Sequence, residues 1–405
     1  MEIKVSIILY LVFVPAAFFW GPVDWQVANP IAVAVYWGVI VLSIALAWLM
    51  FSYACQRSTN NLGVGEVKSA QDVGWVWFSL AVAFIYLKSM QMTGLSLFEG
   101  LAIVTKGANE SYAEMVRYSL NRTSKPMLSL GVAVLSLPFW AGLFFLFKNK
   151  GVSFRRAKLV FLLLLYSFFV MMKGADKEIL EIVLFVLLFY FFDGKFRGGG
   201  KKVVVGFVVV AFVSLVAIRK LNRSAEDVCF YLYCLGEDST ALEEAFALLV
   251  GYSVQGLKGL SVALEGAFFR QPELCVSPMV SSFVYKITGG CQGNGAVVEL
   301  IDSSGVWTSR GQWISLPVWL SSLGGLWIVP FVLFLHALVF CFALASRGKM
   351  KGDFFYFVFV FYSIIYFIYL PANNQVFLTA DSLLLFVVSF FYVGVNFIRS
   401  LKWAR

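Results

Sequence analysis

The sequence predicts an all-α polytopic membrane protein, with about ten spanning helices and one large, mostly helical loop on the outer side. Hydrophobic residues make up 60% of its 405 residues and charged residues only 14%, whereas soluble domains average about 45–50% and 25%. The apolar residues also gather in runs long enough to cross a bilayer as helices. So much apolar surface needs lipid around it, and the lipid bilayer is therefore the first expected partner.

The predicted spans fall into two groups on either side of one long polar segment. Residues 1–218 hold about seven spans, with an outer segment near 88–125, and residues 324–405 hold about three. The first run is expected to remain as a span, because the residues after it make a poor signal-peptide cleavage site. The fifth and sixth runs are short for membrane spans. Either residues from the segment between them lengthen these two spans, or the pair is partly re-entrant. The runs are 3–20, 31–55, 74–90, 126–147, 159–172, 179–192, 203–218, 324–345, 354–370 and 376–398.

The distribution of Lys and Arg predicts the orientation. If both termini lie in the cytoplasm, the inner segments hold 18 of these residues and the short outer segments hold 7. The other 7 lie in the long segment and are not counted, because long loops cross a membrane regardless of charge. Since basic residues favour the inner side, both termini are predicted there. Orientation thus accounts for much of the net charge of +9, and no nucleic-acid partner is expected.

The long outer segment, residues 219–323, is too long for an unstructured connection and is expected to fold. Thr240 and Glu243 form a capping-box pattern, and apolar residues recur after them at helical spacing. This pattern predicts one amphipathic helix near 240–269, lying on or dipping into the membrane interface. Residues 312–322 contain two tryptophans and are expected to form an interfacial lead-in to the next span.

Four of the 6 cysteines lie in this outer segment, which suggests an oxidising compartment and two disulfides. The other two fall in predicted spans. Proximity in the sequence favours the pairs Cys229–Cys234 and Cys275–Cys291. Three pairings are possible, and four free thiols are the alternative.

Missing motifs exclude several kinds of site. The chain has 1 histidine, His336, in the middle of a predicted span, and it has neither a histidine cluster nor a CxxC pair. No metal or other cofactor is therefore expected. The phosphate-binding loop GxxxxGK[ST] and the nucleophile elbow GxSxG are also missing. His336 is interpreted as a helix-packing residue.

Basic residues nevertheless recur on the predicted outer face, where they are disfavoured. Several separate segments bring them to one membrane depth. This favours an anionic ligand such as a lipid-linked pyrophosphate, because guanidinium groups bind phosphate oxygens in pairs. For any one residue, contact with lipid headgroups is the alternative. The residues assigned to the ligand are Lys173, Lys177, Arg117, Arg122, Arg219, Arg223 and Arg310.

Two further sets of polar residues are candidates for chemistry or binding. Glu181 lies one turn into the sixth predicted span, where an ionisable residue is functional by default, although an ion pair with Lys177 would also satisfy it. Tyr252, Gln255 and Lys258 lie on the predicted helix of the outer segment. They combine an aromatic face with an amide, as sugar-binding sites often do, and packing would explain them equally well.

Four parts of the chain resemble the O-antigen polymerase (Wzy-type) family of bacterial membrane proteins, which is related to the O-antigen ligases. They are similar to the family's arginine-bearing outer segment, its Gly-Ser-Arg turn, its loop-helix motif and the entry to the next span. Lys177 takes the arginine place in the turn, whereas Ser322 stands where many members have an acidic residue. The resembling stretches are 111–118, 173–178, 252–257, and 306–309 together with 323–327.

The resemblance implies a metal-independent glycosyltransferase of the GT-C type in the bacterial inner (cytoplasmic) membrane, active on the periplasmic face. It would move the growing glycan from undecaprenyl pyrophosphate onto a sugar hydroxyl of a new lipid-linked repeat unit. Its partners would be undecaprenyl-pyrophosphate-linked oligosaccharides and a chain-length regulator protein. Lys177 and Arg117, which match the family's motifs, would stabilise the leaving pyrophosphate together with Arg219, which is chosen only for its position directly after the seventh span. A carboxylate would take the hydroxyl proton. The candidates for that carboxylate are Asp176, Glu181, Glu243 and Glu244.

Three other functions are compatible with the sequence. An O-antigen ligase shares the donor and the fold, but ligases carry a histidine in the large outer loop, and this segment has none. A lipid-linked oligosaccharide flippase or another transporter should show repeated halves and charges at the membrane midplane. A structural scaffold would not need so many outer cations.

Overall fold

The computed structural model describes residues 2–55, 75–93, 126–148, 154–173, 177–192, 229–230, 233–234, 241–291, 295–308, 314–346, 352–373 and 376–402. Helices occupy every predicted span within these residues, whereas the predicted span 203–218 lies outside them. The helices in these spans are α1 (Glu2–Phe19), α2 (Pro30–Cys55), α3 (Trp75–Thr93), α6 (Pro126–Lys148), α7 (Arg155–Lys173), α8 (Lys177–Phe192), α15 (Val329–Ala345), α17 (Phe354–Ile368) and α18 (Ala380–Lys402).

Four helical segments in the described part of the chain are long and apolar enough to cross a membrane. A helix is stable in a lipid bilayer because its backbone N–H and C=O groups form hydrogen bonds with each other. The helical fold class is thus confirmed, while the number of about ten crossings stays a prediction. The four segments are Pro30–Ser52, Met127–Lys148, Leu326–Ala345 and Ala380–Ser400, and the shorter apolar helices are Ile3–Phe19, Leu180–Phe192 and Phe354–Ile368.

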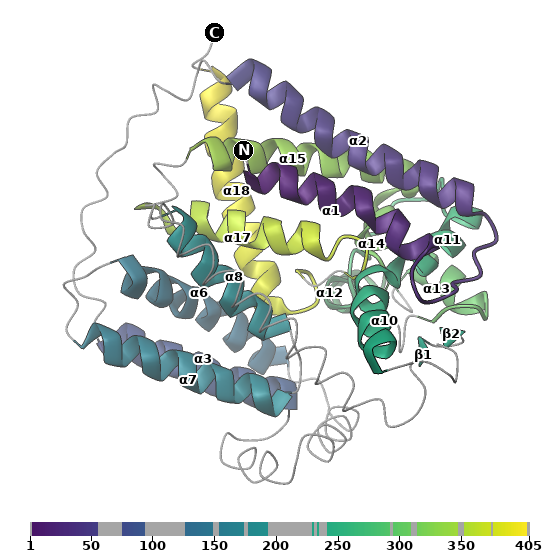
Figure 1. Ribbon diagram of the computed structural model, residues 1–405. Coiled ribbons are helices and arrows are strands. Elements are labelled where there is room, and N and C mark those ends of the chain that lie inside the picture. The colour runs from purple at the N-terminus through teal and green to yellow at the C-terminus, as the bar shows by residue number, and fades with distance from the viewer. Residues whose placement is uncertain are drawn as a thin grey trace.

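These helices pack into a bundle in which α3 lies along α6 and α7, α15 lies along α2, and α18 contacts both α17 and α6 (Figure 1). Aromatic rings fill the space between α3, α6 and α7. The ring of Phe139 stacks on Phe84 and on Tyr166, with centroids 4.7 and 5.2 Å apart. His336 also packs among rings, with its centroid 4.5 Å from that of Tyr366, as expected for a packing residue.

One end of the bundle gathers basic side chains. Arg155 at the start of α7 donates hydrogen bonds to the carbonyl oxygens of Leu146 and Phe147 near the end of α6. Lys158 lies 4.5 Å from the ring centroid of Trp75, the first residue of α3. These helix ends are the ones that the charge distribution assigns to the cytoplasmic side.

Residues 219–323, the segment predicted to lie on the outer side, include a group of shorter elements beside the end of α1 and the start of α2 (Figure 1). Two short strands pair in antiparallel fashion, and the remaining elements are helical. The elements are β1 (Cys229–Phe230), β2 (Tyr233–Cys234), α10 (Ala241–Val254), α11 (Gly256–Gly266), α12 (Pro278–Thr288), α13 (Ala296–Ser303), α14 (Leu316–Leu320) and the 3₁₀ turn η3 (Ser321–Leu323). A second 3₁₀ turn, η4 (Leu326–Ile328), follows at the start of the next candidate span.

The single helix predicted near 240–269 is two helices, α10 and α11, which meet at Gln255. We attribute the break to a tertiary contact. A Cβ atom at Gly256 would overlap the carbonyl oxygens of Pro371 and Ala372, so the backbone of another segment lies against this point. The first residues of α11 are buried in protein instead of lying at an interface. Trp319, from the predicted interfacial lead-in, is likewise buried in α14.

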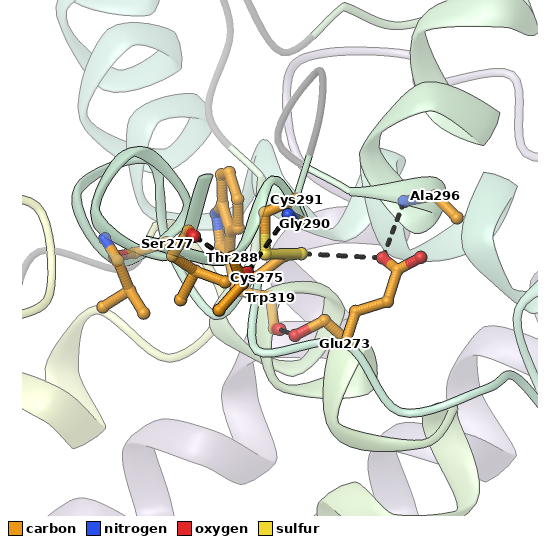
Figure 2. The surroundings of a disulfide bond; sticks show 11 residues. Glu273, Cys275, Ser277, Thr288, Gly290, Cys291, Ala296 and Trp319 are labelled. Atoms are coloured by element: carbon orange, nitrogen blue, oxygen red, sulfur yellow. Dashed lines mark hydrogen bonds between the residues drawn. A yellow bond between two sulfur atoms is a disulfide. The ribbon is translucent and has the colours of Figure 1, made fainter. Parts of the chain in front are cut away.

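Cys275 and Cys291 form a disulfide, the pair that proximity in the sequence favours. Glu273 lies beside it, where its Oε2 accepts a hydrogen bond from the backbone N–H of Ala296 at 3.0 Å (Figure 2). The other favoured pair occupies directly opposed positions of β1 and β2. Opposed residues of antiparallel strands lie at a distance that suits a disulfide, so the second bond stays a prediction with compatible geometry.

Candidate functional site

Four ionisable side chains meet inside the helix bundle, toward the end away from the basic residues described above. They come from α3, α8 and α18, and each is at most 2% exposed. Ionisable residues buried among apolar helices are costly and usually mark function. The members of this buried charge cluster are Lys88, Glu178, Glu181 and Asp381.

Lys88 is the positive centre of the cluster. Its Nζ lies 2.6 Å from Oδ2 of Asp381, a buried ion pair between α3 and α18. Glu181 and Glu178 also interact electrostatically with Lys88. The ammonium lies 5.4 Å from the ring centroid of Phe84, which adds a cation–π contact.

Two of the negative charges lie at the N-terminal ends of helices, where negative charge is favourable. Asp381 is in the first turn of α18 and Glu178 in the first turn of α8. The positive end of a helix dipole stabilises carboxylates at such positions. The start of α18 is fixed by Ser382, whose hydroxyl donates to the carbonyl oxygen of Val376 at 2.8 Å. The first turns of α8 and α18 thus carry two of the three carboxylates of the cluster.

Among the described side chains, the cluster holds three carboxylates and one cation. Buried charge without compensation is strongly unfavourable, so carboxylates in such a site are protonated or paired with cations. Lys173 ends α7 and Lys177 begins α8, directly before Glu178, so the sequence supplies two more cations at these helix ends. In the described part of the chain, no three His, Cys, Asp or Glu side chains lie close enough together to hold a metal ion.

Two buried tyrosines border the cluster. Tyr166 of α7 and Tyr362 of α17 both interact electrostatically with Glu181 and Asp381. Among the described residues, no group forms a hydrogen bond with the hydroxyl of Tyr166. The arrangement therefore combines a cation, carboxylates and phenolic hydroxyls, which are groups able to hold and pass protons.

Of the residues predicted as catalytic, Glu181 is the one whose side chain the structure places in this cluster. Lys173 and Lys177 lie at the adjacent helix ends by their backbones, and their side chains lie outside the description. The remaining predicted cations and Asp176 lie outside the described residues, so their roles stay predictions: Arg117, Arg122, Arg219, Arg223 and Arg310.

The predicted sugar-binding residues lie at the junction of α10 and α11. Lys258 is buried, and its Nζ donates to the carbonyl oxygen of Gln26 at 3.0 Å, which ties α11 to the connection between α1 and α2. Gln255 is 1% exposed, and Tyr252 is half-buried. This geometry agrees better with the packing interpretation than with an open sugar site.

Sequence reasoning did not single out Lys88 or Asp381 as site residues. Both lie within predicted spans, 74–90 and 376–398. A charged residue inside an apolar run was the sign of a functional role that the sequence offered. In the charge count for the orientation, Lys88 was instead one of the 7 basic residues of the short outer segments. Their pairing could not be foreseen, because the two residues are 293 positions apart.

Comparison of the chain with protein-family models, curated proteins and solved structures finds no match.

Proposed function

We propose that this protein is a metal-independent glycosyltransferase that polymerises lipid-linked repeat units, as the O-antigen polymerases do, on the periplasmic face of a bacterial inner membrane. The buried charge cluster is the observation that carries this proposal. It joins Glu181 to a buried cation within one or two turns of the 173–178 stretch that resembles the family's Gly-Ser-Arg turn.

In the proposed reaction, an acceptor hydroxyl oxygen attacks the anomeric carbon of the donor glycan. The bond from that carbon to undecaprenyl pyrophosphate breaks, and the hydroxyl proton passes to Glu181. Lys177, Arg117 and Arg219 stabilise the negative charge on the leaving pyrophosphate, the role that metal ions have in other enzymes. The Lys88–Asp381 pair positions the carboxylates of the cluster.

The length of the surface glycan in a deletion strain tests this function. Glu181→Gln keeps the shape of the side chain and removes the base, so transfer should fall by about 10²–10⁴-fold. The strain that carries this variant should show single-unit caps in place of long polymer on a silver-stained gel. Glu299→Gln, the same change at an exposed position on α13, is the matched control and should restore full polymer. Full-length polymer from Glu181→Gln at equal expression would contradict the assigned role.

A transporter of lipid-linked oligosaccharides is the second candidate, because the ion pair and two further carboxylates lie within the helix bundle, as in proton-coupled transporters. The same gel separates the two functions. Loss of transport removes all capping, since no repeat unit reaches the outer face. Loss of polymerisation leaves the single-unit caps.

A further inference from the structure

Three exposed aromatic side chains lie where the outer segment meets the candidate span Leu326–Ala345. Phe268 and Phe269 follow the end of α11, and Trp327 is in the first turn of the span. Their exposed fractions are 44%, 73% and 51%. We refer to Phe268, Phe269 and Trp327 as the aromatic boundary group.

Backbone hydrogen bonds hold this group at a fixed level. The N–H of Leu326 donates to the carbonyl oxygen of Ala267 at 3.0 Å, and the N–H of Trp327 donates to that of Phe268 at 3.4 Å. The rings of Phe269 and Trp327 lie 6.5 Å apart. Residues 267–269 therefore lie at the same depth as the start of the span.

The group continues the exposed face of the span. Trp327, Phe331 and Leu335 follow one another at intervals of four residues, and all three are exposed. Residues at this spacing share one face of a helix. Such an apolar face on a membrane helix contacts lipid tails, and tryptophan is enriched where it reaches the headgroups.

Arg270 adds a positive charge directly beside the group. Its backbone N–H donates to the carbonyl oxygen of Gly324 at 3.3 Å, and its side-chain Nε donates to the carbonyl oxygen of Gly266 at 3.0 Å. The second bond holds the guanidinium at the C-terminal end of α11, which Phe268 and Phe269 follow directly. Cations just outside an apolar boundary attract anionic headgroups.

We propose that the turn 267–270 and Trp327 insert into the outer leaflet of the bilayer and bind anionic phospholipid, so that the outer segment is anchored to the membrane beside α15. The aromatic rings contact the upper acyl chains, and Arg270 contacts the phosphates. This anchor fixes the end of α11, and it is independent of the proposed transferase activity.

Photo-crosslinking of the full chain in proteoliposomes tests the anchor without any assay of activity. A benzophenone amino acid replaces Phe269 or Trp327 in vesicles of phosphatidylethanolamine and phosphatidylglycerol, and mass spectrometry detects phospholipid adducts. Both positions should give adducts, as should Phe331 on the span. The exposed Ser303 of α13 is the negative control. Adducts at Phe331 without adducts at Phe269 and Trp327 would overturn the proposal, and so would a protein adduct in their place.

The lipid composition of the adducts tests the role of Arg270. One basic residue near an anionic surface is worth a factor of about 5 in affinity. Adducts at position 269 should therefore be enriched in phosphatidylglycerol over its share of the vesicle, and Arg270→Gln should remove that enrichment while Arg270→Lys keeps it. Enrichment that persists in Arg270→Gln would overturn the assigned phosphate contact.

Discussion

The ion pair between Lys88 and Asp381 is the best-defined contact of the buried charge cluster, and single substitutions test how much the fold depends on it. Lys88→Met keeps the length of the side chain but leaves Asp381 buried without its partner. We expect the free energy of unfolding to fall by about 3–5 kcal/mol. Lys88→Met combined with Asp381→Leu should recover part of this loss, because Asp381 is then no longer a buried charge without its partner, whereas Glu178 and Glu181 still lack the cation.

Denaturation in detergent measures these differences. Lys286→Met, which removes an exposed lysine from α12, is the control and should change stability little. A Lys88→Met protein as stable as the wild type would contradict the buried ion pair. So would a double variant whose loss equals the sum of the two single losses.

For single residues, the sequence revealed a member of the cluster only where that residue stood out without reference to another segment. Glu181 could be picked out because an acid lay inside an apolar run. Lys88 and Asp381 lay inside such runs too, but their meaning depends on each other and on helices brought together by folding. Ion pairs between distant segments leave no local pattern, so one sequence alone could not reveal this one.

The break between α10 and α11 can be tested with two glycines of the same helix. Gly256→Ala would push a methyl group into the backbone of 371–372, and overpacking of this kind costs about 1–3 kcal/mol. At Gly259 the new Cβ would lie 3.4 Å from Cδ1 of Trp307, an ordinary contact. Gly259→Ala should therefore be neutral or stabilise the helix by up to about 1 kcal/mol. Equal thermal stability of the two variants would refute this explanation of the break.

The disulfides belong to the same scale, because they tie short elements of the outer segment together. Mass spectrometry of non-reduced peptides should find Cys275–Cys291 and Cys229–Cys234. Replacing the first pair by alanine should lower stability by about 3 kcal/mol, as expected for a loop of this length. Alkylation of all four cysteines in the native protein would exclude both bonds.

Helical elements were predictable to different degrees. The spans could be predicted because a long apolar run is soluble in lipid and, as a helix, forms all its backbone hydrogen bonds within itself. The helix break at Gln255 could not, since Leu257, Leu260 and Leu264 continue the helical spacing across it. We attribute the break to the backbone of residues 371–372, which lies against Gly256. The sequence near Gln255 gives no indication of that contact.

At the scale of the whole molecule, basic residues and the buried charge cluster lie toward opposite ends of the bundle. The predicted orientation puts the basic end in the cytoplasm and the cluster toward the periplasm. An alkaline phosphatase fusion after Ser239 should therefore be active, and one after Lys201 should be inactive. The reverse pattern would invalidate every outer-face assignment made above.

Polymerisation by the purified protein tests the central claim most directly. The protein is reconstituted in vesicles with the lipid-linked repeat unit extracted from a deletion strain, in the presence of a metal chelator. We predict products of two and more repeat units together with released undecaprenyl pyrophosphate, and neither in the Glu181→Gln protein. Folded wild-type protein that leaves the repeat unit unchanged under these conditions would contradict the account.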